Sequence, residues 1–281
     1  MAGVIDSLTT VEGPDRVNYE TGVMLNADDF KAEQDYHRGR LARALEYLIG
    51  SGTIAGLRVV HEAASEGDED NPAMEERLMI NPGLAMDPLG RMLEVPRHLC
   101  IRLSLWFDQQ NDQDLRQGWH AAGTLWSDSP AGVVVDVLIQ FITCERGKTP
   151  AFAAGPFDAL DAVTASRLRD SVETSLFIRR EPTPPLPENP WPNLADIADG
   201  EARTAILRDT IFDAWKTGAP ETTSLFIARL VIEATEAVAD GRPIRVASNA
   251  VAVNNSLRPF VYTTAALARW LGIDLAGGAD D

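Results

Sequence analysis

Residues 19–37 read YETGVMLNADDFKAEQDYH, and residues 52–59, beyond a further helical stretch, read GTIAGLRV. Asn26 is a favourable helix N-cap, and Asp29 lies in the first turn, where the helix dipole favours negative charge. The pattern predicts one helix from Asn26 to about Ile49, where two glycines end it. Such a helix is about 35 Å long, which is unusual for a globular protein.

One face of this helix carries mainly apolar side chains that recur every 3–4 residues. We expect the face to pack inward. Gln34 and His37 lie one turn apart on it, and as buried polar groups they need hydrogen-bond partners, for which we expect backbone edges of a β-structure. The residues of this face are Phe30, Gln34, His37, Leu41, Leu45 and Leu48.

The glycines of the two segments indicate how the helix joins a sheet. Gly22 permits a turn with positive φ before the helix. Gly52 and Gly56 allow a tight reversal that places Leu57 and Val59 in the sheet. Every part of the pattern is explained by positioning a helix, and no part requires chemistry.

Short β-branched runs separated by turn signals fill the remainder of the chain and indicate antiparallel strands. We predict an α+β protein: a long N-terminal helix packed on an antiparallel β-sandwich, with a small helical insertion and a short C-terminal helix. Val133–Thr143 is expected to be a central strand. The other expected strands are Leu57–His61, Arg77–Ile80, Arg91–Val95, Cys100–Leu103, Thr174–Arg179, Ser224–Ile232 and Ile244–Val246.

The domain organisation follows from composition. Residues 1–15 are expected to be a flexible N-terminal arm, and 16–262 the α+β sandwich domain. Within it, 62–76 reads as a solvated acidic loop, and 181–218 as a proline-rich linker followed by a helical insertion. Residues 263–281 form the C-terminal helix and tail.

Charge and composition exclude several classes of function. The 281 residues carry a net charge of −17, which repels phosphate backbones and anionic lipid, so we expect no nucleic-acid binding and no membrane insertion. Two cysteines fit a reduced compartment. Residues 1–10 lack the pattern of a signal peptide, so we expect synthesis in the cytoplasm.

Catalytic and cofactor motifs are missing from the sequence. The four histidines do not form H-E-x-x-H, and neither a G-x-S-x-G, a P-loop nor a G-x-G-x-x-G occurs. The acidic run at 68–70 lacks the spacing of an EF-hand. We therefore expect no enzyme, no catalytic residue, no cofactor and no metal, with His37 a hydrogen-bonded structural residue. A hydrolase using a scattered acid–base pair remains a distant alternative.

The two quoted segments resemble the opening of a family of baseplate- and tail-associated structural proteins from extracellular contractile injection systems and phage tails. More distantly, they are similar to the start of the type VI secretion baseplate subunit related to phage receptor-binding proteins. Weaker similarity continues to about residue 260, and the sequence departs from the family at Glu20, Thr21 and Val23. The residues that carry the resemblance are Tyr19, Gly22, Leu25, Asp29, Phe30, Glu33, Gln34, Tyr36, His37, Gly52, Gly56 and Leu57.

The resemblance implies a structural component of a phage-tail-like contractile particle, a baseplate or tail-end subunit for protein–protein assembly or fibre attachment. Its implied partners are other baseplate or tail subunits, with the chain present as a homo-oligomer or in multiple copies. It would be incorporated into a virion or an extracellular injection particle. Trp191, Trp215 and Trp270 are candidate interface residues, since tryptophan is enriched at interfaces.

A second hypothesis is a glycan- or receptor-binding adhesin module. Trp119 and Trp126 lie in a polar, loop-like stretch where their rings could stack on sugars. Tryptophan more often fills cores and interfaces.

Overall fold

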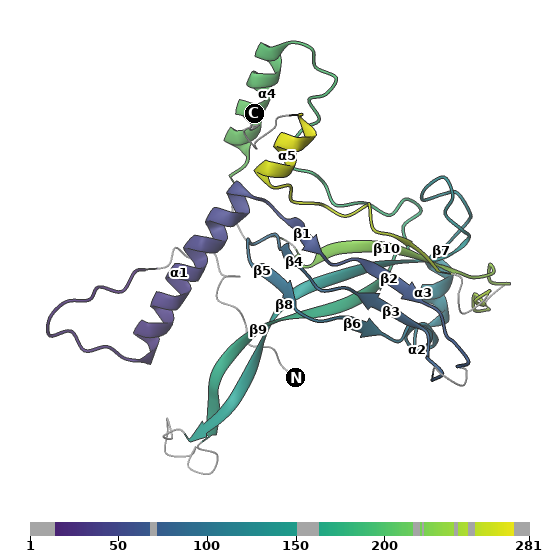
Figure 1. Ribbon diagram of the computed structural model, residues 1–281, viewed down its shortest axis with the longest axis horizontal. Coiled ribbons are helices and arrows are strands. Elements are labelled where there is room, and N and C mark those ends of the chain that lie inside the picture. The colour runs from purple at the N-terminus through teal and green to yellow at the C-terminus, as the bar shows by residue number, and fades with distance from the viewer. Residues whose placement is uncertain are drawn as a thin grey trace, which may run out of the picture.

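Antiparallel sheets around one hydrophobic core, with helices at the periphery, give the α+β fold expected from the sequence (Figure 1). The computed structural model describes residues 15–67, 72–150, 163–215, 220, 222–238, 241–246 and 251–272. Nearly all of the expected N-terminal arm, part of the acidic loop, the end of the helical insertion and the last nine residues lie outside the described residues.

Two small antiparallel sheets come from the first half of the chain. One has the order β1 (Gly52–Gly56), β4 (Gly83–Met86), β5 (Met92–Val95). The other has the order β2 (Val59–Glu62), β3 (Arg77–Ile80), β6 (Leu99–Ile101). The chain passes from one sheet to the other at Gly56 and Leu57, which both have positive φ. A Cβ on Gly56 would lie 2.1 Å from the Pro82 carbonyl oxygen, so glycine is required there.

A larger sheet comes from the second half. Its order is β11–β10–β8–β7, and β9 also pairs with β8. The expected central strand is confirmed, because β8 pairs with β7, β9 and β10. The strands are β7 (Trp119–His120), β8 (Gly132–Pro150), β9 (Val163–Ile178), β10 (Leu225–Glu233) and β11 (Val251–Asn254).

One core joins the three sheets. Leu57, Leu93, Ile139 and Leu230 are fully buried in it although they come from different parts of the chain. The apolar runs of β8 and β10 are buried almost continuously, which is why they read as uninterrupted hydrophobic segments.

The first helix confirms the predicted capping. In α1 (Ala27–Leu48) the Asn26 side chain accepts hydrogen bonds from the Asp28 and Asp29 backbone N–H groups, and the Asp29 carboxylate accepts one from the Asn26 N–H. Gly22 has the expected positive φ of 91°. The other helices are α2 (Leu103–Asp108), α3 (Asp112–Gln117), α4 (Gly200–Asp213) and α5 (Thr264–Trp270).

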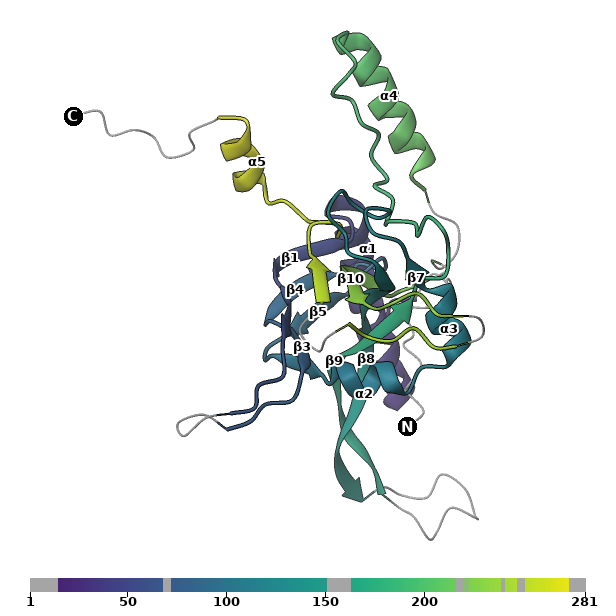
Figure 2. The ribbon, with the colours of Figure 1, turned by 90° about the vertical axis from the view of Figure 1, so that its right-hand side faces the viewer.

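Several elements project from the body. Beyond residue 144, where the β8 side chains become exposed, β8 and β9 leave the body as a two-stranded arm, and α4 projects at the opposite end in both views (Figures 1 and 2). The N-terminal half of α1 extends sideways (Figure 1). The helices α4 and α5, which overlap in Figure 1, are well separated in Figure 2.

The structure corrects two local predictions. Ile244–Val246 is not a strand, since Arg245 makes only an isolated bridge to Ala234. The reading of 62–76 as a solvated loop is wrong at both ends. Glu62 belongs to β2, and the Glu76 side chain is buried.

Candidate protein interface

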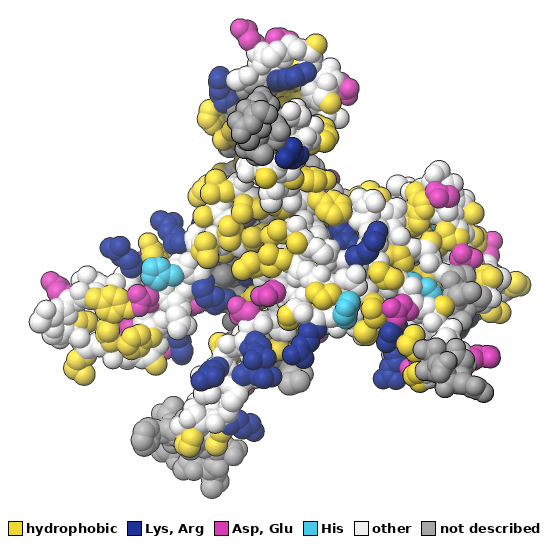
Figure 3. Space-filling model, in the orientation of Figure 1, with side chains coloured by type: hydrophobic (Ala, Val, Ile, Leu, Met, Phe, Trp, Pro, Cys, Tyr) yellow, Lys and Arg dark blue, Asp and Glu magenta, His cyan; other side chains and the backbone are white. Residues whose placement is uncertain are grey.

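Large apolar side chains are exposed on three peripheral elements. On the N-terminal segment, Met24 is 93% exposed. On α4, Phe212 is 70% exposed, and next to α5, Leu271 follows Trp270, which is 82% exposed. Figure 3 shows apolar side chains gathered over α1 and over the upper part of the body. Apolar side chains that gather on a surface mark a site of interaction with another molecule.

The apolar face of α1 exists but does not pack inward along its length. Ala42 is the one buried residue of this helix, while Phe30, Leu41 and Leu48 are exposed. Gln34 and His37 are exposed as well, so the expectation that they bind buried β-edges is wrong for this chain alone. The physical reason is that the body reaches only the C-terminal half of α1, where the turn after β4 approaches Ala42.

The remaining residues of the motif order the entry into α1. Tyr19 donates a hydrogen bond from its hydroxyl to the Glu33 carboxylate, which ties the preceding segment to the helix. His37 Nε2 lies 3.7 Å from Glu33 Oε1, and the His37 ring packs edge-on against the Tyr36 ring. Leu25 is partly exposed before the cap. Downstream, Val59 begins β2 as predicted, whereas Leu57 lies in the link between β1 and β2 with a positive φ and not in the sheet. Both side chains are buried in the core.

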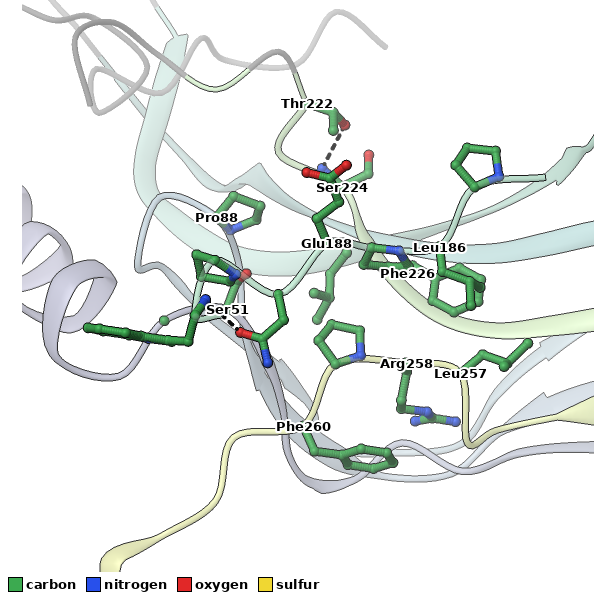
Figure 4. A pocket seen from close by; sticks show the side chains of 18 of the residues that line it. Ser51, Pro88, Leu186, Glu188, Thr222, Ser224, Phe226, Leu257, Arg258 and Phe260 are labelled. Atoms are coloured by element: carbon green, nitrogen blue, oxygen red, sulfur yellow. Dashed lines mark hydrogen bonds between the residues drawn. The ribbon is translucent and has the colours of Figure 1, made fainter. Parts of the chain in front are cut away.

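An open groove of about 1380 Å³ lies between the end of α1, the proline-rich segment and residues 256–262. Figure 4 shows Leu186 and Phe226 across this groove from Arg258 and Phe260. Its walls also carry Tyr47, Trp191 and Tyr262. The groove therefore presents a mainly apolar and aromatic lining beside the exposed side chains of α4 and α5.

A buried ion pair holds the proline-rich wall of the groove in place. Arg229 of β10 lies directly opposite Asp136 of β8, with Nε–Oδ1 and Nη2–Oδ2 distances of 2.7 and 3.0 Å. The same guanidinium donates to the carbonyls of Pro184 and Pro185 at 3.1 and 2.9 Å. Residues 181–192 are thus anchored to the sheet and do not form a free linker.

Arg258 anchors the opposite wall. Its guanidinium donates to the Leu57 carbonyl at 2.7 Å and to the Asn255 carbonyl at 3.0 Å. Burial, reinforced by the nearby charge of Arg58, lowers the pKa of Arg258 to about 10. The Leu57 contact fixes Arg258 against the link between β1 and β2, and the Thr53 N–H of β1 donates to the Pro259 carbonyl at 2.9 Å, so this segment forms the edge of the groove.

The three candidate interface tryptophans lie in different places. Trp191 is on the groove wall, half-exposed. Trp215 stacks on Tyr47 with ring centroids 6.0 Å apart. The Arg43 guanidinium carbon lies 4.6 Å from the centroid of the Trp215 ring. These contacts join the end of the α4 segment to α1. Trp270 is the most exposed of the three and contributes to the α5 surface.

The two tryptophans of the adhesin hypothesis are partly buried. Trp119 packs against the hydrophobic core, and its Nε1 donates to the Ala234 carbonyl at 2.9 Å. Trp126 is also partly covered, and its backbone carbonyl accepts a hydrogen bond from Ser129. Their positions match the commoner structural use of tryptophan.

A buried polar cluster surrounds Glu76. Its carboxylate accepts hydrogen bonds from two Arg245 nitrogens at 2.6 Å each, from Ser104 Oγ, and contacts His61 Nε2 at 2.8 Å. Burial alone raises the pKa of this carboxyl, but the hydrogen bonds from Arg245, Ser104 and His61 outweigh it, and the pKa lies below the usual 4.5. The cluster fastens the Arg245 segment to β2, β3 and α2.

The Glu76 cluster predicts a pH-dependent component of stability. Because the folded-state pKa is lowered, the stabilisation is fully present above about pH 4.5 and is lost as pH falls through the folded value. We expect Glu76→Gln to be destabilised by about 3 kcal/mol at pH 7 and to lose less stability than the wild type between pH 6 and 3. Urea unfolding across pH tests this.

The control for that experiment is Glu75→Gln, because Glu75 is exposed and pairs with Arg102 at 3.6 Å. It should keep both the stability and the pH profile of the wild type. A Glu76→Gln profile parallel to that of the wild type would show that this carboxyl does not supply the acid sensitivity.

Among the residues that the structure describes, no three His, Cys, Asp or Glu side chains form a group suited to a metal ion. No helix in the described ranges has the length and apolar character needed to cross a membrane.

Comparison with known proteins gives distant likeness to solved structures. No protein-family model and no curated protein matches the sequence. Among solved structures, the chain is similar to one in "The baseplate complex from the type VI secretion system", with 12% identity and a TM-score of 0.27. The match covers 82% of this chain and 57% of that chain, so this protein spans little more than half of its length.

The structure also shows functional groups that the sequence analysis missed. Asp136 and Arg229 are the single charges in two otherwise apolar strand runs, VVVDVLI and LFIARLVI. A lone charge in a buried strand needs a partner, so the two could have been paired from sequence. No comparable pattern in the sequence indicates that the Met24 side chain is exposed.

Proposed function

We propose that this chain is a structural subunit of a phage-tail-like contractile particle, where it joins neighbouring baseplate or tail-end subunits or attaches fibres. One observation supports assembly above all others: large apolar side chains are exposed on α1, α4 and α5 of the same chain. Burying one such side chain contributes about 1.5–3 kcal/mol, so a partner covering a few of them would bind stably.

The kind of particle is proposed from the sequence resemblance of residues 19–59. The structure gives that motif a consistent physical role, since it caps α1 and leads the chain into the core. The proposed role is structural and not catalytic. The protein would be made in the cytoplasm and incorporated in several copies beside other baseplate or tail subunits.

The proposal predicts that removing the apolar surfaces blocks assembly without unfolding the chain. Phe212→Ser combined with Trp270→Ser should keep the wild-type circular dichroism spectrum, because both side chains are exposed. We expect incorporation of this variant into particles to fall at least about tenfold, since two buried anchors are lost. Mass spectrometry of purified particles measures incorporation, and negative-stain images show the baseplate.

Val238→Ser combined with Ile244→Ser is the matched control. These two apolar residues are also exposed but lie on the segment after β10, away from α4 and α5. The control should assemble normally. If the Phe212 and Trp270 variant enters particles as well as the control does, or if particles lacking the protein have an unaltered baseplate, the proposal is wrong.

A further inference from the structure

One side of the projecting arm of β8 and β9 carries a cluster of cations although the whole chain is strongly acidic. The protein has a net charge of −17, yet the distal arm carries four exposed cations, Arg146, Lys148, Arg167 and Arg169. Figure 3 shows basic side chains gathered along this arm, in the lower part of the view. A confined basic region on an acidic protein is a distinct electrostatic feature.

The strand register places all four cations on one face of the arm. Arg146 lies directly opposite Arg167, Cys144 opposite Arg169, and Lys148 opposite Ala165. Alternate residues of a strand share a face, so the four charges belong to the same side. We call this side, defined by Arg146, Lys148, Arg167 and Arg169, the basic face.

The opposite side of the arm is different. Glu145 lies opposite Leu168, and Thr143 lies opposite Asp170, which puts both carboxylates on the other face. Glu173 lies opposite Gln140 and so is on the side of the cations, but at the base of the arm, where its carboxylate accepts a hydrogen bond from Gln140. Farther out, Arg146, Lys148 and Arg167 share their side with no carboxylate of the described residues.

The basic face does not stabilise the fold. None of its four side chains forms an ion pair with another described residue. Like charges placed directly opposite, as Arg146 and Arg167 are, destabilise a strand pair by a few tenths of a kcal/mol or more. The arrangement is unfavourable in the isolated chain and becomes favourable when carboxylates cover it.

The arm is also accessible for docking. β10 pairs with β8 only as far as Ile139, and from Gln140 onward β8 pairs with β9 alone among the described strands. Both outer edges of the distal arm are therefore open. A partner reaches Arg146, Lys148 and Arg167 without displacing any described element of the fold, whereas Arg169 lines a recess at the base of the arm beside α1 and β5.

We propose that the basic face docks on a carboxylate-rich surface of another protein. Its small extent favours this occupant. A nucleic-acid duplex or an anionic bilayer is larger than the arm and would also meet the strongly acidic body, which repels it. A folded partner with a confined acidic patch meets only the cations. This inference rests on the arm and is independent of the apolar surfaces of α1, α4 and α5.

A fluorescent poly-L-glutamate peptide serves as the probe, with binding to the full chain measured by anisotropy at low and at physiological salt. Wild type should bind the peptide, with affinity falling as salt increases. Arg146→Glu combined with Arg167→Glu should weaken binding by about tenfold or more, because attraction is replaced by repulsion. Lys31→Glu combined with Arg208→Glu is the control, since it makes the same change in net charge at exposed positions of α1 and α4.

Three parallel measurements identify results that overturn the proposal. A 20-base-pair DNA duplex or phosphatidylserine vesicles bound more tightly than the peptide through the same arginines would assign a different class of partner. Self-association of wild type in sedimentation, lost in the arm variant, would make a second copy the occupant. Equal peptide binding by the arm variant and the control, with aggregation of the arm variant, would show that the cations only protect the open edges.

Discussion

Replacement of Arg229 by alanine is expected to destabilise the protein by about 3–5 kcal/mol, because it leaves the buried Asp136 carboxylate without its bidentate partner. Arg179 lies 3.3 Å from the same carboxylate and cannot replace both contacts. The carbonyls of Pro184 and Pro185 lose their donors as well. Urea unfolding should therefore show the loss of stability, and limited proteolysis should cut faster within 181–199.

The matched variant for this test is Arg208→Ala, which removes an exposed arginine of α4. Its stability should change by less than about 0.5 kcal/mol. If Arg229→Ala costs no more than Arg208→Ala, then the Asp136 pair does not hold the groove wall, and the description of the 181–192 segment as anchored fails.

Replacement of Gly90 by alanine should detach α1 from the body. Gly90 has φ of 74°, and a Cβ there would lie 1.9 Å from the Ala42 carbonyl oxygen, so the helix and the turn cannot both keep their positions. We expect a loss of about 2–4 kcal/mol, combining backbone strain with the clash. Hydrogen exchange should become faster in residues 38–48, where α1 meets the body.

Gly123→Ala separates strain from the clash. Gly123 has nearly the same φ, 73°, but an added Cβ would have only one neighbour within 4 Å, the Ser127 carbonyl oxygen at 3.8 Å. This control should lose only about 1 kcal/mol and leave exchange in α1 unchanged. Equal effects of the two substitutions would mean that Gly90 does not position the helix.

Local signals in the sequence were sufficient for the elements that depend on local physics. The Asn26 cap, the turn at Gly22 and the position of Val59 in a strand could all be predicted, because each follows from a side chain and its immediate neighbours. The apolar run at 133–143 likewise identified a central strand. Antiparallel α+β architecture followed from the number and spacing of such runs.

Features that depend on distant contacts could not be predicted. An apolar stripe at 3–4 spacing does not tell whether its cover comes from the same chain or from another, and α1 has its stripe mostly exposed. Glu76 resembled its solvated acidic neighbours because its partner, Arg245, is far along the chain. The continuation of β8 to Pro150 was missed since its distal residues are polar.

The candidate interface was only partly visible in the sequence. Trp191, Trp215 and Trp270 were identified as a residue class that favours interfaces, but their separate positions required the fold. The basic face depends on the pairing of Arg146 with Arg167, a register that no local pattern specifies. The charged side chains that share one side of the arm are therefore identified only once the strands are paired.

Hydroxyl-radical footprinting of the free chain and of the purified particle tests most directly whether this protein is an assembly subunit. Met24, Phe212 and Trp270 are reactive and exposed in the isolated chain. We expect all three to be strongly protected in the particle, while exposed Val238 keeps its reactivity. Unchanged oxidation of Met24, Phe212 and Trp270 in intact particles that contain the protein would contradict the proposal that these surfaces form its contacts.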